Sequence, residues 1–149
     1  MMSLLAIRRL VATDAMAAAR LHQRGGALIP GYDTSLHSSA EYVTFYRDTV
    51  LVDCTVWGAF AGTKLRGHIA LLPGWIEHLY VDPDFIGRGI GQQLVRKVQD
   101  DQAELRLYTF QSNVRARRFY EYLGFVIEEL TDGSRNEEKM PDMTYHWRR

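Results

Sequence analysis

Along this chain, stretches in which hydrophobic and polar residues alternate give way to stretches in which hydrophobic residues recur every three or four positions. The change is clearest between residues 75 and 101, WIEHLYVDPDFIGRGIGQQLVRKVQDD. Residues 76–81 are rich in strand-forming side chains and predict a strand, which ends at 82–84 because proline has no N–H for a ladder. Helical spacing then predicts a helix from about 89 to 102. Its apolar face comprises Ile90, Leu94, Val95 and Val98.

The same two periods assign the rest of the chain. Further strands are predicted at 4–10, 55–60, 65–71, 104–110, 125–130 and 143–147. Further helices are predicted at 14–22, about 41–49 and 113–123, with Thr13, Ser38 or Ser39, and Asn113 as candidate N-caps and Gly25-Gly26 and Gly124 as ends. Consecutive strands with short turns predict an antiparallel meander, whereas strand–helix–strand predicts a right-handed crossover between parallel strands. We therefore expect an α/β (α+β) fold: a single domain, residues 1–149, with a mixed, mostly antiparallel sheet of about seven strands and about four helices.

Composition narrows the class of protein. The formal net charge is zero and 24% of residues are charged, so the overall field indicates neither a nucleic-acid nor a membrane partner. Near-neutral charge mildly favours self-association, which leaves a homodimer open. Cys54 is the only cysteine, so no internal disulfide and no cysteine metal cluster is available, and we expect a buried structural thiol. No apolar run is long enough to span a membrane, and apolar residues precede Arg8-Arg9 in the reverse of a secretory signal, so we expect a cytoplasmic protein.

A glycine-rich run follows the strand at 76–81 and begins the next helix. The first N–H groups of a helix have no intrahelical partner, and glycines let a phosphate approach the backbone, so this order is typical of an anion site. A simple turn is the other reading of Gly87-Arg88-Gly89. A Walker loop is excluded because Gly-x-x-x-x-Gly-Lys-Ser/Thr is absent, and a dinucleotide fingerprint because Gln92 stands where glycine is needed.

Val81-Asp82-Pro83, followed by Gly89 and Gly91, resembles the acetyl-coenzyme A (acetyl-CoA) motif of the GNAT superfamily of N-acetyltransferases. That pattern opens with Gln or Arg, whereas this chain has Ile86. The substitution removes one polar contact to the pyrophosphate but leaves the backbone cradle, and Arg88 can supply the charge.

A second motif strengthens the resemblance. Asn113-x-x-Ala116-x-x-Phe119-Tyr120-x-x-Leu123-Gly124-Phe125 is similar to the segment with which the family contacts the cofactor a second time. The predicted order of strands and helices also resembles the GNAT order over nearly the whole chain. Two motifs at the right separation are more specific than either alone.

The resemblance implies transfer of an acetyl group from acetyl-CoA to an amine, without a covalent enzyme intermediate and without a metal. By this resemblance the pantetheine amides would pair with the backbone of Leu79, Tyr80 and Val81, since a strand that leaves its parallel neighbour exposes unpaired groups. The pyrophosphate would bind Gly87, Arg88, Gly89, Ile90, Gly91 and Gln92, and the side chain of Asn113 would contact the cofactor arm. Asn113 as a helix cap is the other reading.

An amine is mostly protonated at neutral pH and must lose a proton before it attacks, while the departing thiolate must gain one. Glu77 is the candidate general base, and a solvated strand carboxylate is its alternative reading. Strict alternation would place Glu77 on one face with Leu79 and Val81, and His78 on the opposite face as a packed or surface histidine. Tyr120 matches the tyrosine that serves the family as general acid, with a helix-face aromatic as the alternative.

The acceptor cannot be identified from the sequence. By family analogy its pocket would be built from the loop at 27–37 and the loop before the last strand. Candidate lining residues are Tyr32, Asp33, His37, Tyr42, Tyr46 and Glu77. Small-molecule and peptide amines both remain open, since one fold hosts many acceptors. The alternative function is a non-catalytic acyl-CoA-binding sensor module.

Overall fold

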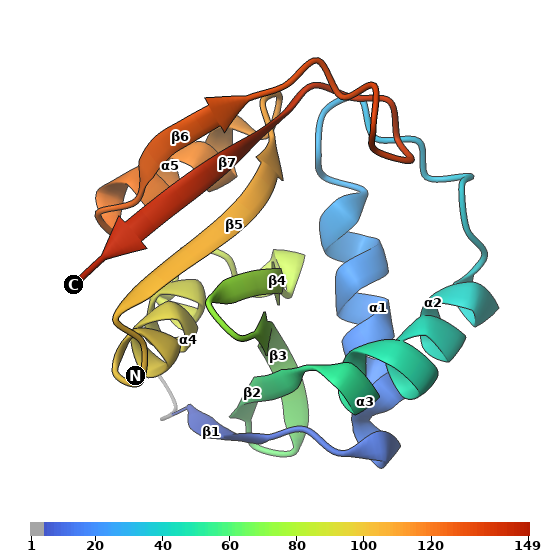
Figure 1. Ribbon diagram of the computed structural model, residues 1–149. Helices are drawn as coiled ribbons and strands as arrows, with labels where there is room; N and C mark the ends of the chain where they lie inside the picture. Colours follow the sequence, from blue (N-terminus) through green and yellow to red (C-terminus); the bar gives the residue numbers. More distant parts are fainter. Residues whose placement is uncertain (1–4) are drawn as a thin grey trace.

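Seven strands form one mixed sheet in the order β1-β2-β3-β4-β5-β7-β6 (Figure 1). The computed structural model describes residues 5–149, so Leu4, predicted to begin the first strand, lies outside the described residues. The strands are β1 (Ala6–Arg9), β2 (Thr55–Ala61), β3 (Lys64–Leu72), β4 (Trp75–Val81), β5 (Glu104–Phe110), β6 (Val126–Leu130) and β7 (Asp142–Arg148). All neighbours are antiparallel except β4 and β5, which are parallel, as the crossover predicted. The predicted fold class is confirmed.

The helices lie close to the predicted positions, with two differences. They are α1 (Ala15–Gly26), α2 (Ser39–Phe45), α3 (Leu51–Asp53), α4 (Ile90–Gln99) and α5 (Val114–Tyr122), with a π-helical turn (Tyr46–Val50) between α2 and α3. Ser38 caps α2 as predicted, since its side chain accepts from the amide of Glu41 at 3.1 Å. Thr13, however, lies inside a 3₁₀ turn and is not the cap of α1.

The prediction that Gly25-Gly26 ends the first helix is wrong, because α1 continues through Gly26. The glycine at 25 serves packing instead. A Cβ on Gly25 would lie 2.7 Å from Cδ1 of Tyr80, so only glycine lets the Tyr80 ring pack against α1.

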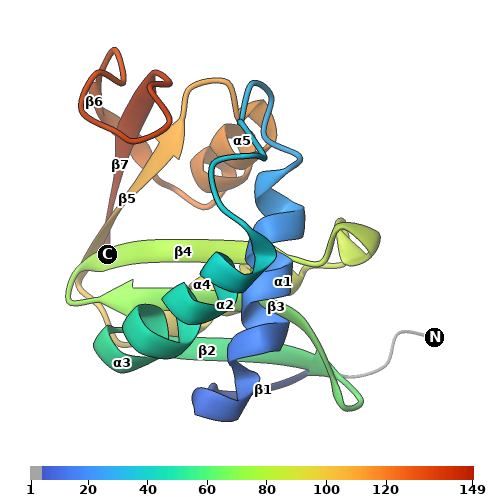
Figure 2. The same ribbon diagram turned by 90° about the vertical axis from the view of Figure 1, so that its right-hand side faces the viewer.

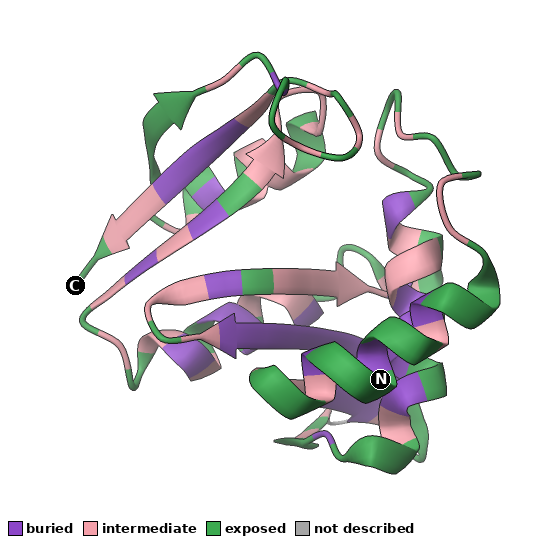
Figure 3. Ribbon diagram, turned by 45° about the vertical axis from the view of Figure 1, so that its right-hand side comes forward, coloured by how far each residue is buried: buried purple, intermediate pink, exposed green. Residues whose placement is uncertain are grey.

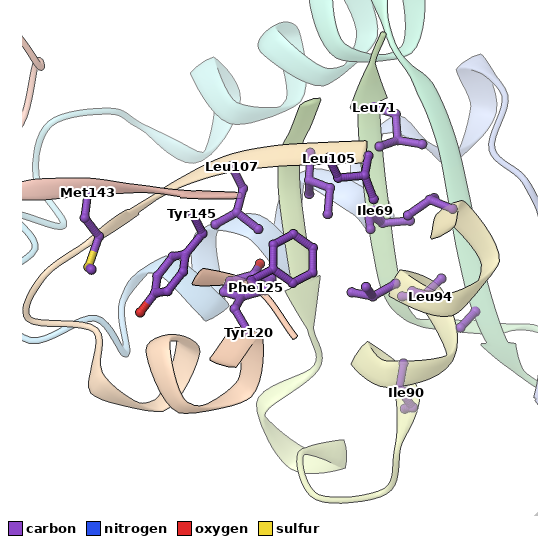
Figure 4. Close-up of a cluster of buried hydrophobic side chains, with 14 residues drawn as sticks. Ile69, Leu71, Ile90, Leu94, Leu105, Leu107, Tyr120, Phe125, Met143 and Tyr145 are labelled. Carbon is purple, nitrogen blue, oxygen red and sulfur yellow. The ribbon is translucent and has the colours of Figure 1, made fainter. Parts of the chain in front are cut away.

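Two apolar cores lie on opposite faces of the sheet. α4 and α5 cover one face, where Leu94, Leu105, Phe125 and Tyr145 are fully buried (Figure 4). α1 and α2 cover the other face, around the fully buried Tyr46. The middle of the sheet is therefore enclosed, while the edge strand β6 is exposed along its length (Figure 3).

The sheet is split between β4 and β5. Their parallel pairing is limited to Trp75 with Arg106 and Ile76 with Leu107. Beyond these residues the two strands diverge, and β5, β7 and β6 turn steeply away from the directions of β2–β4 (Figure 2). A bulge accompanies the divergence: Ala70 pairs with His78 and Leu71 with Ile76, which leaves Glu77 without a cross-strand partner. The edge of β4 that faces β5 is therefore open from Glu77 onward.

Candidate active site

A cavity of about 600 Å³ extends from the loop before α4, along the open edge of β4, to the start of α5. We call it the glycine-loop cavity. Its lining includes Leu79, Tyr80 and Val81 from β4, the predicted loop residues Gly87, Gly89, Ile90, Gly91 and Gln92, and Asn113 and Tyr120 from α5 and its cap. No acidic side chain lines it within the described residues. The structure thus brings together nearly all of the residues predicted to bind the cofactor.

The loop offers backbone donors to an anion. Among the described residues, no hydrogen bond leaves the amides of 86–92, and the first such bond in α4 runs from Gln93 to the carbonyl of Gly89. Gly87 and Gly89 have φ values of 86° and 79°, and nothing lies within 4 Å of a Cβ built on either. The left-handed backbone favours glycine, and the open space and unpaired amides fit a diphosphate.

The loop is anchored at its start by a buried carboxylate. Asp82 is 1% exposed, accepts from Arg66 at 2.8 Å, and pairs with Arg24 of α1 at 3.2 Å. Arg88 does not line the glycine-loop cavity; its guanidinium lies 4.5 Å from the centroid of the Phe85 ring. Ile86, at the position where the family pattern has Gln or Arg, lines the cavity and is exposed.

Asn113 caps α5 as predicted and lies beside the glycine-loop cavity. Its side-chain oxygen accepts from the amide of Ala116 at 3.3 Å, which caps α5, and its side chain also borders the glycine-loop cavity. The cap fixes the side chain at the end of the cavity that is opposite the loop.

Glu77 lies at the bulge of β4 and lines a second cavity of about 900 Å³, the polar cavity, which is enclosed mainly by β4, β5 and the loop before β7. The bulge lies at Glu77, and from His78 onward the register with β3 is regular, with His78 packed against His22 on the face opposite Leu79 and Val81, as expected. Leu79 and Val81 pack on the core beneath α4, while Glu77 is exposed. Burial, followed by the Glu77 carboxylate, raises the pKa of the Cys54 thiol, which is half-buried and not buried as predicted.

Tyr120 lies where the polar cavity meets the glycine-loop cavity, and it lines both. Its side chain is 7% exposed, and its hydroxyl has no hydrogen-bond partner within residues 5–149. Burial raises the pKa of Tyr120, so the phenol keeps its proton throughout the neutral range. A phenol that keeps its proton and lacks a protein partner is free to donate to a ligand.

A third cavity of about 700 Å³ lies between α1, α2 and the loop before β7 (residues 131–141), which we call the late loop. We call it the aromatic cavity, because His22, Tyr32, Tyr42, Phe45, Tyr80 and Phe110 line much of it. The predicted residues Tyr32 and Tyr42 are joined through their hydroxyls at 3.2 Å. Tyr46 and Asp33 were expected here but are elsewhere: Tyr46 is in the core, and Asp33 accepts from Ser35. Ile29 and Tyr80 line all three cavities, so the cavities meet at these two residues.

Three histidines form a neutral group beside the aromatic cavity, which the sequence did not indicate. The Tyr46 hydroxyl is 2.8 Å from Nδ1 of His22 and 2.8 Å from Nε2 of His68. Burial lowers the pKa of His22 to about 2, of His68 to about 3 and of His78 to about 4, with neighbouring histidines adding to the effect on the first two. His78 is packed, as expected, yet it also lines two cavities. None of the three carries charge at neutral pH.

His37 joins the two loops that border the aromatic cavity. Its Nε2 is 2.7 Å from Glu137 of the late loop, and its Nδ1 is 3.3 Å from Glu41 of α2. The hydrogen bond to Glu41, together with the charge of Glu137, raises the pKa of His37. The link is therefore fully formed below the unfolded-state pKa of ~6.5 and is lost as pH rises through the higher folded-state pKa.

We expect hydrogen exchange in residues 27–38, corrected for intrinsic rates, to be slower at pH 6 than at pH 8.5. His37→Gln should remove that difference, because glutamine does not titrate. His146→Gln is the matched control, since His146 pairs with Glu104 on β5 instead. Equal pH dependence in His37→Gln and in the wild-type protein would contradict this role.

The comparisons with known proteins agree with the fold. A family model described as the acetyltransferase (GNAT) domain matches residues 41–127, more than half of the chain. The chain belongs to the GNAT family of acetyltransferases. It is therefore an acetyl-CoA-dependent enzyme of the N-acetyltransferase class.

Individual relatives share little sequence identity with this chain but match it over most of its length. The chain is 28% identical over 106 residues to the peptidyl-lysine N-acetyltransferase YiaC of Escherichia coli strain K12, which covers 70% of this chain and 71% of the relative. A GCN5-related N-acetyltransferase structure from Rhodopseudomonas palustris matches with a TM-score of 0.79, 21% identity and coverage of 100% and 98%. The PaiA N-acetyltransferase of Thermoplasma acidophilum, solved in complex with coenzyme A, matches with a TM-score of 0.72, 21% identity and coverage of 98% and 99%. These two structures show the fold.

No helix in residues 5–149 is both long and apolar enough to cross a membrane. In the same part of the chain, no three His, Cys, Asp or Glu side chains lie in an arrangement that could hold a metal ion.

Proposed function

We propose that this protein transfers the acetyl group of acetyl-CoA directly to an amine, with Glu77 as general base and Tyr120 as general acid. Acetyl-CoA supplies a thioester carbonyl to the attacking amine and leaves as a thiol. The observation that carries the proposal is the junction at Tyr80: the glycine-loop cavity, which fits the donor, meets there two cavities that can admit an acceptor. The PaiA structure, solved with coenzyme A, supports the donor assignment.

Backbone groups and side chains would each bind a different part of the donor. The amides of residues 87–92 would hold the diphosphate, because they are unpaired and lie at the positive end of α4. The open edge of β4 at Leu79, Tyr80 and Val81 would pair with the pantetheine amides in the manner of an added strand. Asn113 would contact the arm of the cofactor at the other end of the cavity.

Glu77 is the carboxylate best placed to take the proton from the amine. It projects from the bulge of β4 into the polar cavity, which it shares with Tyr80, Leu79 and Tyr120. His78 is also nearby, but its ring packs against His22 and Phe45, and burial lowers its pKa to about 4. Because Glu77 is exposed, the proton can pass directly or through one water.

Tyr120 is the group best placed to assist the departing sulfur. Transfer of a proton from a phenol of pKa ~10 to a thiolate of pKa ~8.5 costs about 2 kcal/mol, and the raised pKa of Tyr120 increases that cost. A strong hydrogen bond from the Tyr120 hydroxyl, completed by proton transfer as the thiol leaves, meets this requirement. No covalent intermediate is needed, and Cys54 lines none of the three cavities.

The test is thiol release from acetyl-CoA, measured across a panel of small amines, amino acids and lysine-containing peptides, alongside calorimetry of coenzyme A binding. We expect coenzyme A to bind and at least one amine to be acetylated, with the product identified by mass. Binding of coenzyme A without turnover of any amine on the panel would favour the non-catalytic sensor. The observation that favours this alternative is Ile86, which stands where the family pattern has Gln or Arg. Failure to bind coenzyme A would contradict both functions.

A further inference from the structure

Charged residues are distributed unevenly around the three cavities. The aromatic cavity is lined by three carboxylates and, within the described residues, by no lysine or arginine. The polar cavity is lined by five carboxylates, one of them shared with the aromatic cavity, against the single cation Arg135. The glycine-loop cavity shows the reverse, since Arg115 lines it and no acidic residue does. In a chain with zero net charge, this separation makes the acceptor side locally negative.

Four of these seven carboxylates are engaged by the protein, and of the other three, Glu77 and Glu129 are exposed whereas Glu138 is half-buried. Glu41 and Glu137 face His37, and Asp142 accepts from Thr131 and Asn136. Glu138 is half-buried, lines both acceptor-side cavities, and forms no ion pair or hydrogen bond within residues 5–149. Its carboxylate is therefore free to pair with a cationic ligand in either cavity.

The position of Glu138 is close to the junction of the cavities. Burial is the main cause that raises the pKa values of Tyr32 and Tyr80, and the Glu138 carboxylate adds to both in the same direction. It therefore lies within electrostatic reach of both hydroxyls, one in the aromatic cavity and one where the three cavities meet.

The walls of the aromatic cavity suit a cation as well. Tyr42 and Phe45 line it, and aromatic rings attract alkylammonium groups. His22 and His78 are neutral and do not repel a positive charge, and His37, whose pKa is raised, pairs with Glu41 and Glu137. Tyr120, a residue that is 7% exposed, lines the polar cavity together with Glu138, and its hydroxyl forms no hydrogen bond within residues 5–149.

We propose that the acceptor is an alkylamine that carries a second positive charge, and that Glu138 determines this specificity by binding the second charge. The inference rests on the proposed function for its acceptor site. Two sources share this chemistry: a free diamine or polyamine, and a lysine side chain with a cationic neighbour in a peptide. The experiments compare a diamine and a cationic peptide, so they distinguish the two sources.

The first measurement is calorimetry without acetyl-CoA, comparing 1,4-diaminobutane with butylamine, which differ by one ammonium group. We expect the diamine to bind at least about tenfold more tightly to the wild-type protein, and Glu138→Gln to reduce this advantage to less than about threefold. Asp101→Asn is the matched control, since it removes an exposed carboxylate distant in sequence and outside all three cavities. Raising the salt concentration should weaken diamine binding more than butylamine binding.

The second measurement is steady-state kinetics with the same pair and with blocked peptides that contain Lys-Arg or Lys-Gln. Glu138→Gln should raise KM about tenfold for the doubly charged acceptor while kcat changes less than about threefold, because Glu138 binds and does not react. The source is a free diamine if only the diamine shows this split, and a peptide lysine if only Lys-Arg does. Equal wild-type preference for singly and doubly charged acceptors would overturn the inference.

The two proposals fail in different ways. If no amine is acetylated although coenzyme A binds, the proposed function fails, but diamine binding by calorimetry still tests Glu138. If butylamine and the Lys-Gln peptide are acetylated as efficiently as their doubly charged counterparts, the enzyme assignment stands. The requirement for a second positive charge on the acceptor is then refuted. Unchanged diamine affinity in Glu138→Gln would likewise refute the role of Glu138.

Discussion

Replacement of Tyr120 by phenylalanine is expected to lower kcat by about 10²-fold, while the affinity for coenzyme A stays within about twofold of the wild-type value. The reason is that Tyr120 lines the junction of the polar and glycine-loop cavities with an unpartnered hydroxyl, and only that hydroxyl is removed. The ring, which packs against Phe125 and Tyr145, is kept, so the core is preserved. Steady-state kinetics and calorimetry of coenzyme A binding measure the two effects.

Tyr122→Phe provides the matched control for this prediction. Tyr122 lies on the same helix, is 78% exposed and lines none of the three cavities, so its substitution should leave kcat unchanged. A Tyr120→Phe enzyme as fast as the wild-type enzyme would show that the hydroxyl takes no part in thiol departure.

Replacement of Glu77 by glutamine is expected to lower kcat by about 10²-fold or more at pH 7, with little change in KM for acetyl-CoA. Glutamine keeps the size of the side chain at the bulge of β4 but cannot accept the amine proton. The defect should shrink as pH rises toward the amine pKa of ~10, because the acceptor then loses its proton to solvent. A kcat profile from pH 6.5 to pH 9.5 measures both features.

The control for Glu77 is Asp53→Asn. Both carboxylates lie close enough to Cys54 to raise the pKa of its thiol, yet Asp53 is exposed outside the cavities. Loss of charge near Cys54 is therefore common to the two variants, and loss of a carboxylate from the polar cavity is specific to Glu77→Gln. A deficit in Glu77→Gln that is constant across the pH range would argue against proton acceptance.

The fold was largely predictable because its elements carry strong local signals. The strand, glycine loop and helix at residues 76–102 differ sharply in hydrophobic period, and the meander of β2, β3 and β4 follows from short turns. The end of the first helix was missed because the use of Gly25 depends on a contact with Tyr80, which is distant in the sequence. A local pattern cannot distinguish a glycine that ends a helix from one that admits a neighbouring ring.

The candidate site was predictable where a motif sets backbone geometry and unpredictable where tertiary packing decides. The glycine loop and Asn113 lie on one cavity because both depend on helix starts, which sequence motifs specify. The bulge at Glu77 was not predicted, since one extra residue in a strand leaves no mark in the pattern of hydrophobicity. The histidines at 22, 68 and 78 come from three different elements, and only the folded chain brings them together.

The short pairing between β4 and β5 has a mechanical consequence. With only two paired positions at this boundary, few backbone hydrogen bonds join the two parts of the sheet, although one apolar core continues across it. An acyl donor bound in the opening between β4 and β5 would keep the two strands apart and would also pair with the edge of β4 as an added strand does. It would thereby connect the part of the sheet that packs on α5 to the part that packs on α1. The amine would then bind in a site of which the donor already forms one side. We therefore expect a kinetic order in which acetyl-CoA binds first and coenzyme A leaves last.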